Sequence, residues 1–465
     1  MNRDLGQTLD IENPRTGETL GEVVLLPERK ISTVAWTAED AFRVWRGVPV
    51  GERCARVLEM AGLLEQQAPR LAREFSREHG KTAAEAEAEL ARSVETLRWS
   101  AHAAVRVTGA TPLSERAGAE RTVEVDPVGP VLAIVSWNFP AVVLARKLGP
   151  ALAMGCSVVI KAPEETPQVI AAFARAAADA GLPPGTVQVV HASAEVTQKL
   201  VGRPEFRLVS FTGSTKVGKA IAHTAAATLT QCVLELGGHA PVIVTADADL
   251  DRAVALLSQA KFSSAGQSCA APSRFLIDRS VHDEFVEKFV RAAPLCDDER
   301  SAHGGSGTMG PLNNARRRDS VHALVQDAVE QGARIRTGGR LPDTPGYYYP
   351  ATVLTDVPPQ ARILREEPFG PVAPVVAFDS AEEAVAMANA TDFALSAYVF
   401  GETSRATALA RRLDAGSVSV NCVGGAAPDA PLGGRAASGY GYEGGDEGLL
   451  AFGRLKVLQR ATPTR

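Results

Sequence analysis

The sequence predicts an α/β fold with mainly parallel sheets. From residue 131 onward, short apolar runs alternate with segments of helical periodicity, which is the rhythm of parallel strands joined by crossover helices. A second series of the same kind follows residue 240. The chain of 465 residues is also longer than the ~250 residues at which a single hydrophobic core stops growing. We therefore expect two α/β domains that meet near Gly237-Gly238.

The segment before these domains is predicted to be helical. Residues 34–110 are rich in Ala, Glu, Arg and Leu, and apolar residues recur there every three or four positions. Glu85, Glu89 and Arg92 follow one another at the spacing of a single helix face. We expect that face to be solvated.

The two α/β series can be divided into individual elements by their apolar runs. The first series predicts strands at Val131–Ser136, Ser157–Lys161, Val187–Val190, Arg207–Thr212 and Cys232–Glu235, with helices at Val169–Ala180 and Val217–Ala227. The second predicts strands at Pro241–Val244, Arg274–Ile277, Val372–Phe378 and Ser417–Asn421, with helices at Leu250–Phe262 and Val281–Arg291.

Two further segments alternate apolar and charged residues, as strands with one exposed face do. They are Arg121–Val125 and, near the end of the chain, Arg454–Arg460. Isolated strands of this kind leave backbone groups unpaired, so they pair with each other or with another subunit.

Composition excludes several classes of protein. The net charge is −5 and the basic residues are spread out, so no nucleic-acid partner is expected. No stretch supplies the ~20 apolar residues that a membrane span needs. The six cysteines show neither CxxC spacing nor a cluster with histidine, which predicts no metal site and a reducing compartment. Charged residues follow Met1 closely, so no signal peptide is visible and we expect a cytoplasmic protein.

Cys269 is the strongest candidate for a reactive group. It ends a run of small and polar residues, residues 263–268, that lies between a helix-like and a strand-like segment. Structural cysteines are usually found in apolar runs, whereas a thiol in a Gly/Ser-rich turn is accessible and can be held as a thiolate. We therefore expect Cys269 to be a nucleophile.

Two polar residues that follow predicted strands could assist such a nucleophile. Asn138 could donate its side-chain amide to a developing oxyanion, although a turn residue before Pro140 is a simpler explanation. Glu235 precedes two glycines that leave room for a water molecule, so it could act as a general base. Taken alone, it could equally be an exposed residue at the end of a strand.

Other segments suggest a nucleotide site. Gly213 and Ser214 lie between a strand and a helix, where backbone amides attract phosphate, but the spacing is not the GxGxxG fingerprint. Lys161 and Glu164 follow another strand and could bind ribose hydroxyls; the carboxylate would repel a 2′-phosphate and so favour NAD over NADP. Glu367 stands before a rigid Pro-Phe-Gly-Pro turn. A structural role of the turn accounts for the prolines but not for the carboxylate before them.

In order and spacing, these segments resemble the aldehyde dehydrogenase superfamily, of the NAD(P)-dependent, non-acylating type. The resemblance runs from about residue 11 to the last strand. Its most specific pieces are residues 137–140, 234–238, 266–269 and 367–371. It implies a Rossmann-type cofactor domain, an α/β catalytic domain and a small β oligomerisation arm.

The resemblance also implies where the domains begin and end. Residues 1–108 and 128–236 would form the NAD-binding domain, and residues 237–430 the catalytic domain. Residues 109–127 and 431–465 would form the oligomerisation arm and the C-terminal segment. A homodimer or homotetramer is implied, because the last strand of such enzymes extends a neighbouring subunit's sheet.

Roles for individual residues follow from the same resemblance. Cys269 would attack the aldehyde, Asn138 and the backbone N–H of Cys269 would stabilise the oxyanion, and Glu235 would activate the water that hydrolyses the thioester. The cofactor, NAD with NADP as an alternative, would contact Ser136, Trp137, Lys161, Glu164, Gly213, Ser214, Gly237, Glu367 and Phe369. The substrate pocket would include Phe139, Arg146 and Ser268.

The chain departs from the family pattern at three positions. His239 and Ala436 replace lysines that are usual there, and neither position carries a catalytic role. Arg146 stands where some semialdehyde-oxidising relatives bind a carboxylate. The second arginine of such sites is replaced by Ser263, so an anionic semialdehyde is not favoured.

Three other functions remain open at this point. A CoA-acylating semialdehyde dehydrogenase would pass the thioester to CoA, but such enzymes tend to lack the base that Glu235 provides. A thiol esterase without a cofactor would not need Lys161, Glu164 and Glu367. A non-catalytic scaffold would not need Cys269.

Overall fold

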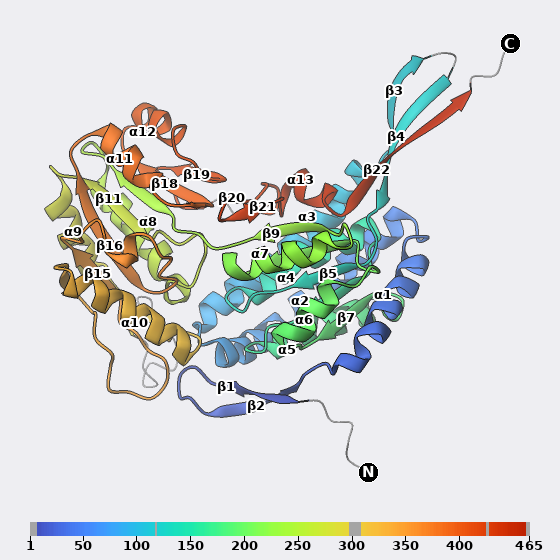
Figure 1. Cartoon of the computed structure of the whole chain (residues 1–465), viewed down its shortest axis with the longest axis horizontal. Coiled ribbons are helices and arrows are strands. Elements are labelled where there is room, and N and C mark those ends of the chain that lie inside the picture. The colour runs from blue at the N-terminus through green and yellow to red at the C-terminus, as the bar shows by residue number, and fades with distance from the viewer. Residues whose placement is uncertain (1–6, 117–118, 297–307, 425–426, 462–465) are drawn as a thin grey trace.

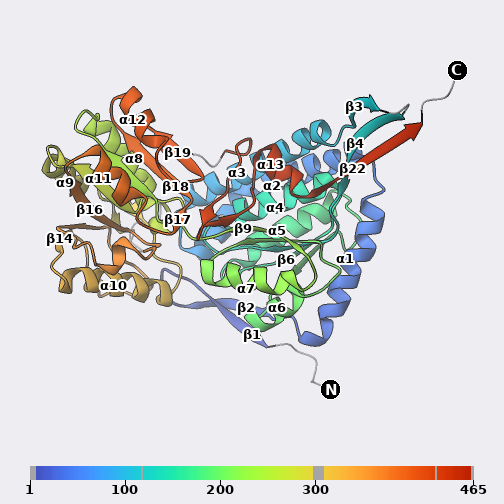
Figure 2. The ribbon, with the colours of Figure 1, turned by 45° about the horizontal axis from the view of Figure 1, so that its top comes forward.

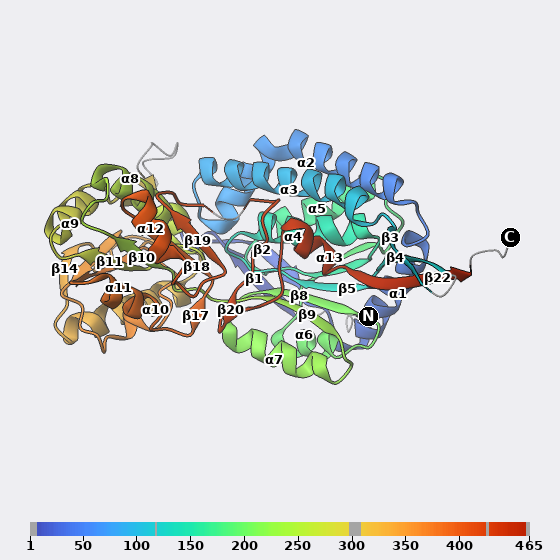
Figure 3. The ribbon, with the colours of Figure 1, turned by 90° about the horizontal axis from the view of Figure 1, so that it is seen from above.

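The computed structural model describes residues 7–116, 119–296, 308–424 and 427–461. Two α/β bodies lie side by side, and a narrow three-stranded arm projects from one of them (Figure 1). The view from above shows the same separation into two bodies and an arm (Figure 3). The predicted fold class is confirmed.

The first body contains a six-stranded sheet with the spatial order β21-β9-β8-β5-β6-β7. The strands are β5 (Val131–Ile134), β6 (Val158–Lys161), β7 (Val187–Val190), β8 (Leu208–Thr212), β9 (Gln231–Glu235) and β21 (Gly439–Tyr440). They are parallel except for β21, which runs antiparallel to β9. From β5 the chain adds β6 and β7 on one side and then crosses to add β8 and β9 on the other side, so the topological switch point lies between β5 and β8. Sheets of this type bind ligands beyond the carboxyl ends of the strands at the switch point.

Helices cover both faces of this sheet because successive strand residues point to opposite sides. In β5, Val131 and Ala133 belong to one hydrophobic core, whereas Leu132 and Ile134 belong to the other. The first core is completed by α2 (Val50–His79), α3 (Ala83–Val107), α4 (Pro140–Met154) and α5 (Pro167–Asp179). The second is completed by α1 (Ile31–Trp45), α6 (Ala194–Val201) and α7 (Thr215–Ala226).

The second body repeats this arrangement around a seven-stranded sheet of order β14-β15-β16-β11-β10-β18-β19. Its strands are β10 (Pro241–Val244), β11 (Arg274–Asp278), β14 (Arg334–Thr337), β15 (Thr352–Thr355), β16 (Val372–Phe378), β18 (Ser396–Phe400) and β19 (Ser417–Val420). Only β14 is antiparallel to its neighbour. The core on one face of this sheet includes residues of α8 (Leu250–Phe262), α9 (His282–Arg291) and α10 (Ala315–Glu330). The core on the other face includes residues of α11 (Ala381–Ala388) and α12 (Thr403–Ala410).

The N-terminal hairpin connects the two bodies. Strands β1 (Thr8–Glu12) and β2 (Thr19–Val24) pair below the first body, and the turn between them points towards the second body (Figures 1 and 2). The backbone N–H of Leu26 donates to the carbonyl of His191 at 2.7 Å in the first body. The backbone N–H of Tyr347 in the second body donates to the carbonyl of Pro14 at 2.9 Å.

Short elements complete the chain. They are the 3-10 helices η1 (Glu28–Lys30), η2 (Ser263–Gly266) and η4 (Arg362–Leu364), the paired strands β12 (Leu295–Cys296) and β13 (Thr308–Met309), the paired strands β17 (Phe393–Ala394) and β20 (Arg435–Ala436), and α13 (Gly445–Leu450). In the part of the chain that the structure describes, no helix combines the length and the apolar character needed to cross a membrane.

The arm joins two segments that lie far apart in the sequence. Strand β4 (Ala119–Pro127) pairs antiparallel with β22 (Gly453–Ala461) over its whole length, and β3 (Thr111–Arg116) pairs with the other edge of β4. In the described residues β22 has no strand on its outer edge. Its apolar side chains at Leu455, Val457 and Leu458 are exposed.

The predicted strands and helices agree with the structure to within two residues at most boundaries. The expectation of a solvated face at Glu85, Glu89 and Arg92 was wrong. Glu89 is fully buried, because it forms an ion pair with the buried side chain of Lys81. Of the three residues, only Arg92 is exposed.

Candidate active site

A cavity of about 470 Å³ opens at the carboxyl ends of β5, β8 and β9, where the first body faces the second. This is the place that the strand order predicts for a ligand. The predicted site residues that line it are Ser136, Trp137, Asn138, Gly213, Ser214, Gly237, Cys269, Glu367 and Phe369.

The loop before Cys269 is held in an unusual conformation. Ser264, Ala265 and Gly266 all have positive φ angles of 47°, 54° and 71°, which costs free energy at the two residues that are not glycine. Gln267 is fully buried and ties the loop down: its Nε2 donates to the carbonyl of Ser264 at 2.9 Å, and its Oε1 accepts from the backbone N–H of Asn313 at 2.9 Å. The sulfur atom that follows is thereby fixed in the cavity.

Cys269 and Glu235 are in direct contact. The Sγ of Cys269 donates to Oε1 of Glu235 at 3.2 Å. Burial, followed by the charge of Glu443, raises the pKa of Glu235 to about 7. Burial and the carboxylate of Glu235 raise the pKa of the Cys269 thiol well above its ordinary value. Burial and this neighbour thus favour the neutral thiol, and the carboxylate is placed to take the thiol's proton.

Asn138 lies beside these groups at the end of β5. Its Oδ1 accepts from Oγ of Ser136 at 2.7 Å, which fixes the amide so that Nδ2 donates to the carbonyl of Gln267 at 3.1 Å. An amide nitrogen carries two hydrogens, so one remains for an oxygen atom bound next to Cys269.

Gly237 and Gly238 allow the chain segments to come this close. A Cβ atom on Gly238 would lie 2.1 Å from the carbonyl oxygen of Cys269, and one on Gly237 would lie 2.9 Å from Oε2 of Glu367. The backbone N–H of Gly238 donates to Oε1 of Glu367 at 3.0 Å. Any side chain at these positions would push the nucleophile loop or Glu367 away.

The rest of the cavity fits a dinucleotide. Ser214 caps α7 by accepting from the backbone N–H of Val217 at 3.4 Å, and the first turn of that helix borders the cavity, as phosphate binding requires. The rings of Trp137 and Phe369 meet edge to face, with centroids 5.6 Å apart, and offer an aromatic wall. Burial raises the pKa of Glu367 to about 8.

Lys161 and Glu164 do not line this cavity. They lie at the carboxyl end of β6, the strand next to β5, and Nζ of Lys161 donates to Oε1 of Glu164 at 2.7 Å. Both side chains are partly exposed. This position suits the outer end of a ligand that extends along the strand ends from the cavity.

The sequence did not reveal the arginines of α10. Arg316 and Arg317 border the cavity, and Nε of Arg317 is buried with no hydrogen-bond partner among the described residues. The charge of Arg317 lowers the pKa of Glu367, so the guanidinium faces the cavity near that carboxylate. A half-buried guanidinium with an unpaired buried N–H beside the cavity fits an anionic ligand such as a pyrophosphate.

A second group that the sequence did not reveal lies behind Glu235. Nζ of Lys147 is fully buried and donates to Oγ of Ser210 at 3.1 Å, to Oγ1 of Thr212 at 2.8 Å, and to Glu443. The charges of Lys147 and Glu443 act on the pKa of Glu235 in opposite directions. No local pattern marks such a pair, because its members are 296 residues apart.

The three residues predicted for the substrate pocket do not line the cavity. Phe139 packs under Nζ of Lys81, 4.6 Å from the ring centroid. Oγ of Ser268 accepts from the backbone N–H of Ala270 at 3.3 Å. Arg146 is buried, and its charge lowers the pKa of both Cys269 and Glu235, so it faces the reactive pair from another side.

The two departures from the family pattern have structural explanations. His239 is buried, with one ring nitrogen 2.9 Å from Oγ of Ser273 and the other 3.2 Å from the carbonyl of Ile363. Burial holds its pKa well below the ordinary value, so the ring is neutral. Ala436 is exposed in the short strand β20.

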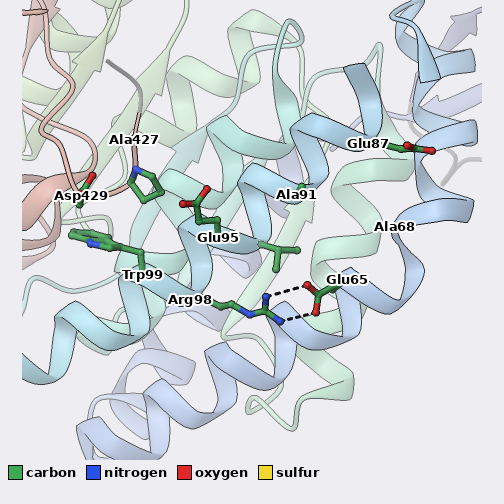
Figure 4. Close-up of a pocket in the computed structure, with 11 residues that line it drawn as sticks. Glu65, Ala68, Glu87, Ala91, Glu95, Arg98, Trp99, Ala427 and Asp429 are labelled. Atoms are coloured by element: carbon green, nitrogen blue, oxygen red, sulfur yellow. Dashed lines mark hydrogen bonds and ion pairs between the residues drawn. The ribbon is translucent and has the colours of Figure 1, made fainter. Parts of the chain in front are cut away.

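A separate cavity of about 520 Å³ lies between α2, α3 and residues 427–429 (Figure 4). It contains none of the predicted site residues. An exposed ion pair crosses it, in which Arg98 donates to both carboxylate oxygens of Glu65 at 3.0 and 2.6 Å.

Known proteins resemble this chain over nearly its full length. The 4-(hydroxymethyl)benzenesulfonate dehydrogenase TsaD1 of Comamonas testosteroni is 43% identical, covering 97% of this chain and 94% of that protein. The succinate-semialdehyde dehydrogenase [NADP(+)] GabD of Escherichia coli strain K12 is 35% identical, with 97% and 94% covered.

Solved structures give the same result. The crystal structure of betaine aldehyde dehydrogenase from Staphylococcus aureus in complex with NAD+ superimposes with a TM-score of 0.94 at 31% identity, covering 99% of this chain and 92% of that one. The sequence model of the aldehyde dehydrogenase family matches residues 1–458. The chain therefore belongs to the aldehyde dehydrogenase family, and it is an oxidoreductase that converts an aldehyde into the carboxylic acid with a nicotinamide cofactor, through a cysteine thioester.

Proposed function

We propose that Cys269, Glu235 and Asn138 carry out this reaction. The observation that supports the proposal most directly is the hydrogen bond of 3.2 Å from the Cys269 thiol to the Glu235 carboxylate, at the end of a cavity where Asn138 keeps a free N–H. Nucleophile, base and oxyanion donor are then within reach of one bound carbonyl group.

Acylation begins with a proton transfer from the Cys269 thiol to Glu235, which leaves a thiolate. Its sulfur forms a bond to the carbonyl carbon, and the carbonyl oxygen becomes an oxyanion. In the described residues nothing accepts from the backbone N–H of Cys269, so this group and the Asn138 amide are the donors for that oxygen. A bound nicotinamide cofactor would supply the hydride acceptor for this carbon, and Cys269 would then carry the acyl group as a thioester.

The residues that would hold the cofactor follow from the cavity. Ser214 and the first turn of α7 would bind the pyrophosphate together with Arg317, and Glu367 would bind the nicotinamide ribose. Phe369 and Trp137 would shield the ring from water.

Deacylation uses Glu235 again. Once its proton has been lost to solvent, the carboxylate accepts a proton from a water molecule, whose oxygen attacks the thioester carbon. The Cys269 sulfur leaves as the thiolate and the carboxylic acid is released.

This assignment disfavours the alternative functions. A CoA-acylating enzyme has no need for a base in contact with the nucleophile, whereas Glu235 makes that contact. An esterase has no need for a half-buried arginine that faces Glu367. Acceleration by CoA, with acyl-CoA as the product, would contradict the hydrolytic assignment.

The first test is a panel of aliphatic, aromatic, carboxylated and sulfonated aldehydes, with the absorbance of reduced cofactor as the readout. We expect turnover by the unchanged protein and a rate for Cys269→Ala at least about 10³-fold lower, because the covalent step is lost. Cys422→Ala is the matched control, since that thiol is exposed and outside the cavity. Normal turnover by Cys269→Ala would refute the mechanism.

The second test concerns the base. Because the pKa of Glu235 is about 7, the carboxylate form increases as the pH rises through 7, and kcat should rise with it. We expect Glu235→Gln to lose this rise and about 10²–10⁴-fold of steady-state turnover. A variant that keeps the pH dependence would show that another group is the base.

We further propose that NAD is preferred over NADP. The carboxylate of Glu164, held by Lys161 at the end of β6, would accept hydrogen bonds from a ribose 2′-hydroxyl and repel a 2′-phosphate. Relatives do not decide the matter, because GabD is named for NADP and the betaine aldehyde dehydrogenase structure contains NAD+.

The third test measures kcat/KM for both nucleotides. Replacing Glu164 by Ser removes the negative charge, so the NADP-to-NAD ratio of kcat/KM should rise about tenfold or more. Glu195→Ser, which removes an exposed carboxylate on α6, should leave the ratio unchanged. A preference for NADP in the unchanged protein would contradict the proposal.

We also propose the division of the chain into an NAD-binding domain (1–108 and 128–236), a catalytic domain (237–430) and an arm with the C-terminal segment (109–127 and 431–465). The two sheets and the arm support it. The open edge of β22 and its exposed apolar residues support a homodimer or homotetramer in which β22 extends a partner's sheet.

The fourth test uses light scattering after size-exclusion chromatography. Leu455 is 73% exposed and Val457 is 56% exposed, and aspartate at both positions should shift the protein towards monomers, because charge would be buried between subunits. Leu229, 90% exposed and away from the arm, provides the control: Leu229→Asp should not change the mass. An unchanged mass for the β22 variant would exclude this interface.

We propose a cytoplasmic location on the evidence of the thiols. None of the six cysteines forms a disulfide. Free thiols throughout a chain of this length are typical of a reducing compartment.

A further inference from the structure

The beginning of α3 contacts both loops of the active site. Glu89 is fully buried, and its Oε1 accepts from the backbone N–H groups of Ala141 at 2.9 Å and Val142 at 3.4 Å, in the first turn of α4. That turn follows Asn138 directly. The N-cap residue of α4, Phe139, makes no capping hydrogen bond of its own, so a carboxylate from another helix satisfies these amides.

Lys81 completes the contact with Asn138. Its ammonium group is buried, forms an ion pair with Glu89, and donates to the backbone carbonyl of Asn138 at 3.3 Å. It also lies 4.5 Å from the ring centroid of Phe75 and 4.6 Å from that of Phe139. The backbone carbonyl of Asn138, the proposed oxyanion donor, is therefore held by a buried ammonium group.

The same helix holds the nucleophile loop. Oε1 of Glu85 accepts from the backbone N–H of Ser264 at 2.6 Å, inside the left-handed stretch before Cys269. The other oxygen of Glu85 caps α3 itself by accepting from the backbone N–H of Thr82 at 2.9 Å. Two carboxylates one turn apart on α3 thus contact the two loops that must be aligned.

Stability alone does not explain the buried pair. Moving two charges out of water is costly, and an apolar pair of similar volume is often as stable or more so. The pair differs from an apolar one in that it makes directed hydrogen bonds to the backbone of residues 138, 141 and 142.

We propose that Lys81 and Glu89 are positioning residues for the reaction: they orient Asn138 so that its amide meets the oxyanion. The proposal depends on the function assigned above to Asn138. Neither residue touches the reacting atoms, and both act through the backbone on either side of that amide.

The test is a double-mutant cycle. In one variant, Lys81→Met and Glu89→Leu replace the ion pair by apolar side chains, which avoids leaving one buried charge alone. We expect kcat to fall about 10–100-fold with Kd for NAD unchanged, since a shift of about 1 Å at a catalytic group has effects of this size. Asn138→Ala alone should lose about 10²–10³-fold.

Combining the two variants separates positioning from general damage. If the pair acts through Asn138, adding Lys81→Met and Glu89→Leu to Asn138→Ala should lower kcat by less than about threefold more. Multiplicative losses, or full kcat in the apolar variant, would overturn the proposal. The exposed pair Glu65–Arg98, which also joins α2 and α3 (Figure 4), is the control: Glu65→Gln should leave kcat unchanged.

A crystal structure of the apolar variant gives a readout that does not depend on activity. We expect Nδ2 of Asn138 to leave hydrogen-bond distance of the Gln267 carbonyl; an unmoved Asn138 would contradict positioning even if no aldehyde were oxidised. Should the unchanged protein fail to oxidise any aldehyde, the proposed function would fail instead. If the apolar variant does not fold, Lys81→Met with Glu89→Gln, which keeps the shape of the residue 89 side chain and leaves neither charge buried alone, replaces it in the cycle.

Discussion

The active site depends on the absence of side chains at Gly237 and Gly238. These residues connect the last parallel strand of the first sheet to the first strand of the second, so the two bodies meet there. A methyl group on Gly238 would collide with the carbonyl of Cys269. Because these two residues have no side chains, the carboxylate of Glu235 in the first body contacts Sγ of Cys269 in the second. For the same reason the carboxylate of Glu367 accepts a hydrogen bond from the backbone N–H of Gly238.

The electrostatic setting of Cys269 changes how its reactivity must be explained. Small residues around the thiol indicated that it is accessible, but burial and two neighbouring carboxylates, Glu235 and Glu367, oppose a negative charge on sulfur. Reactivity then comes from a proton acceptor in contact with the thiol.

The local pattern of apolar, polar and glycine residues was sufficient to predict most of the strands and helices and part of the candidate site. Buried parallel strands are short apolar runs, so Val187–Val190 and Pro241–Val244 were predicted with their observed bounds. Asn138, Cys269 and Glu235 stand at strand ends or in Gly-rich turns, where polar residues are conspicuous. Only the family resemblance indicated that Asn138 and Cys269 would line one cavity and that Glu235 would contact Cys269.

The buried or bonded charged residues that the sequence did not predict share one property: their hydrogen-bond and ion-pair partners are distant in the chain. Glu89 and Glu85 sit on a helix whose spacing looks like that of a solvated face, and only the approach of α4 and of the Cys269 loop buries them. Lys147 and Glu443 are likewise joined only by folding. Buried charge pairs leave no periodic signal, because either member alone resembles a surface residue.

The arm has a consequence for the order of events during synthesis. Strand β4 is made more than 300 residues before β22, its partner along all nine positions (for example, Lys456 and Asp126 are 330 residues apart). The same late segment supplies β21 to the first sheet. Since N-terminal domains generally fold first during translation, this edge must stay open until β21 and β22 have been made, and subunits can associate through β22 only after that.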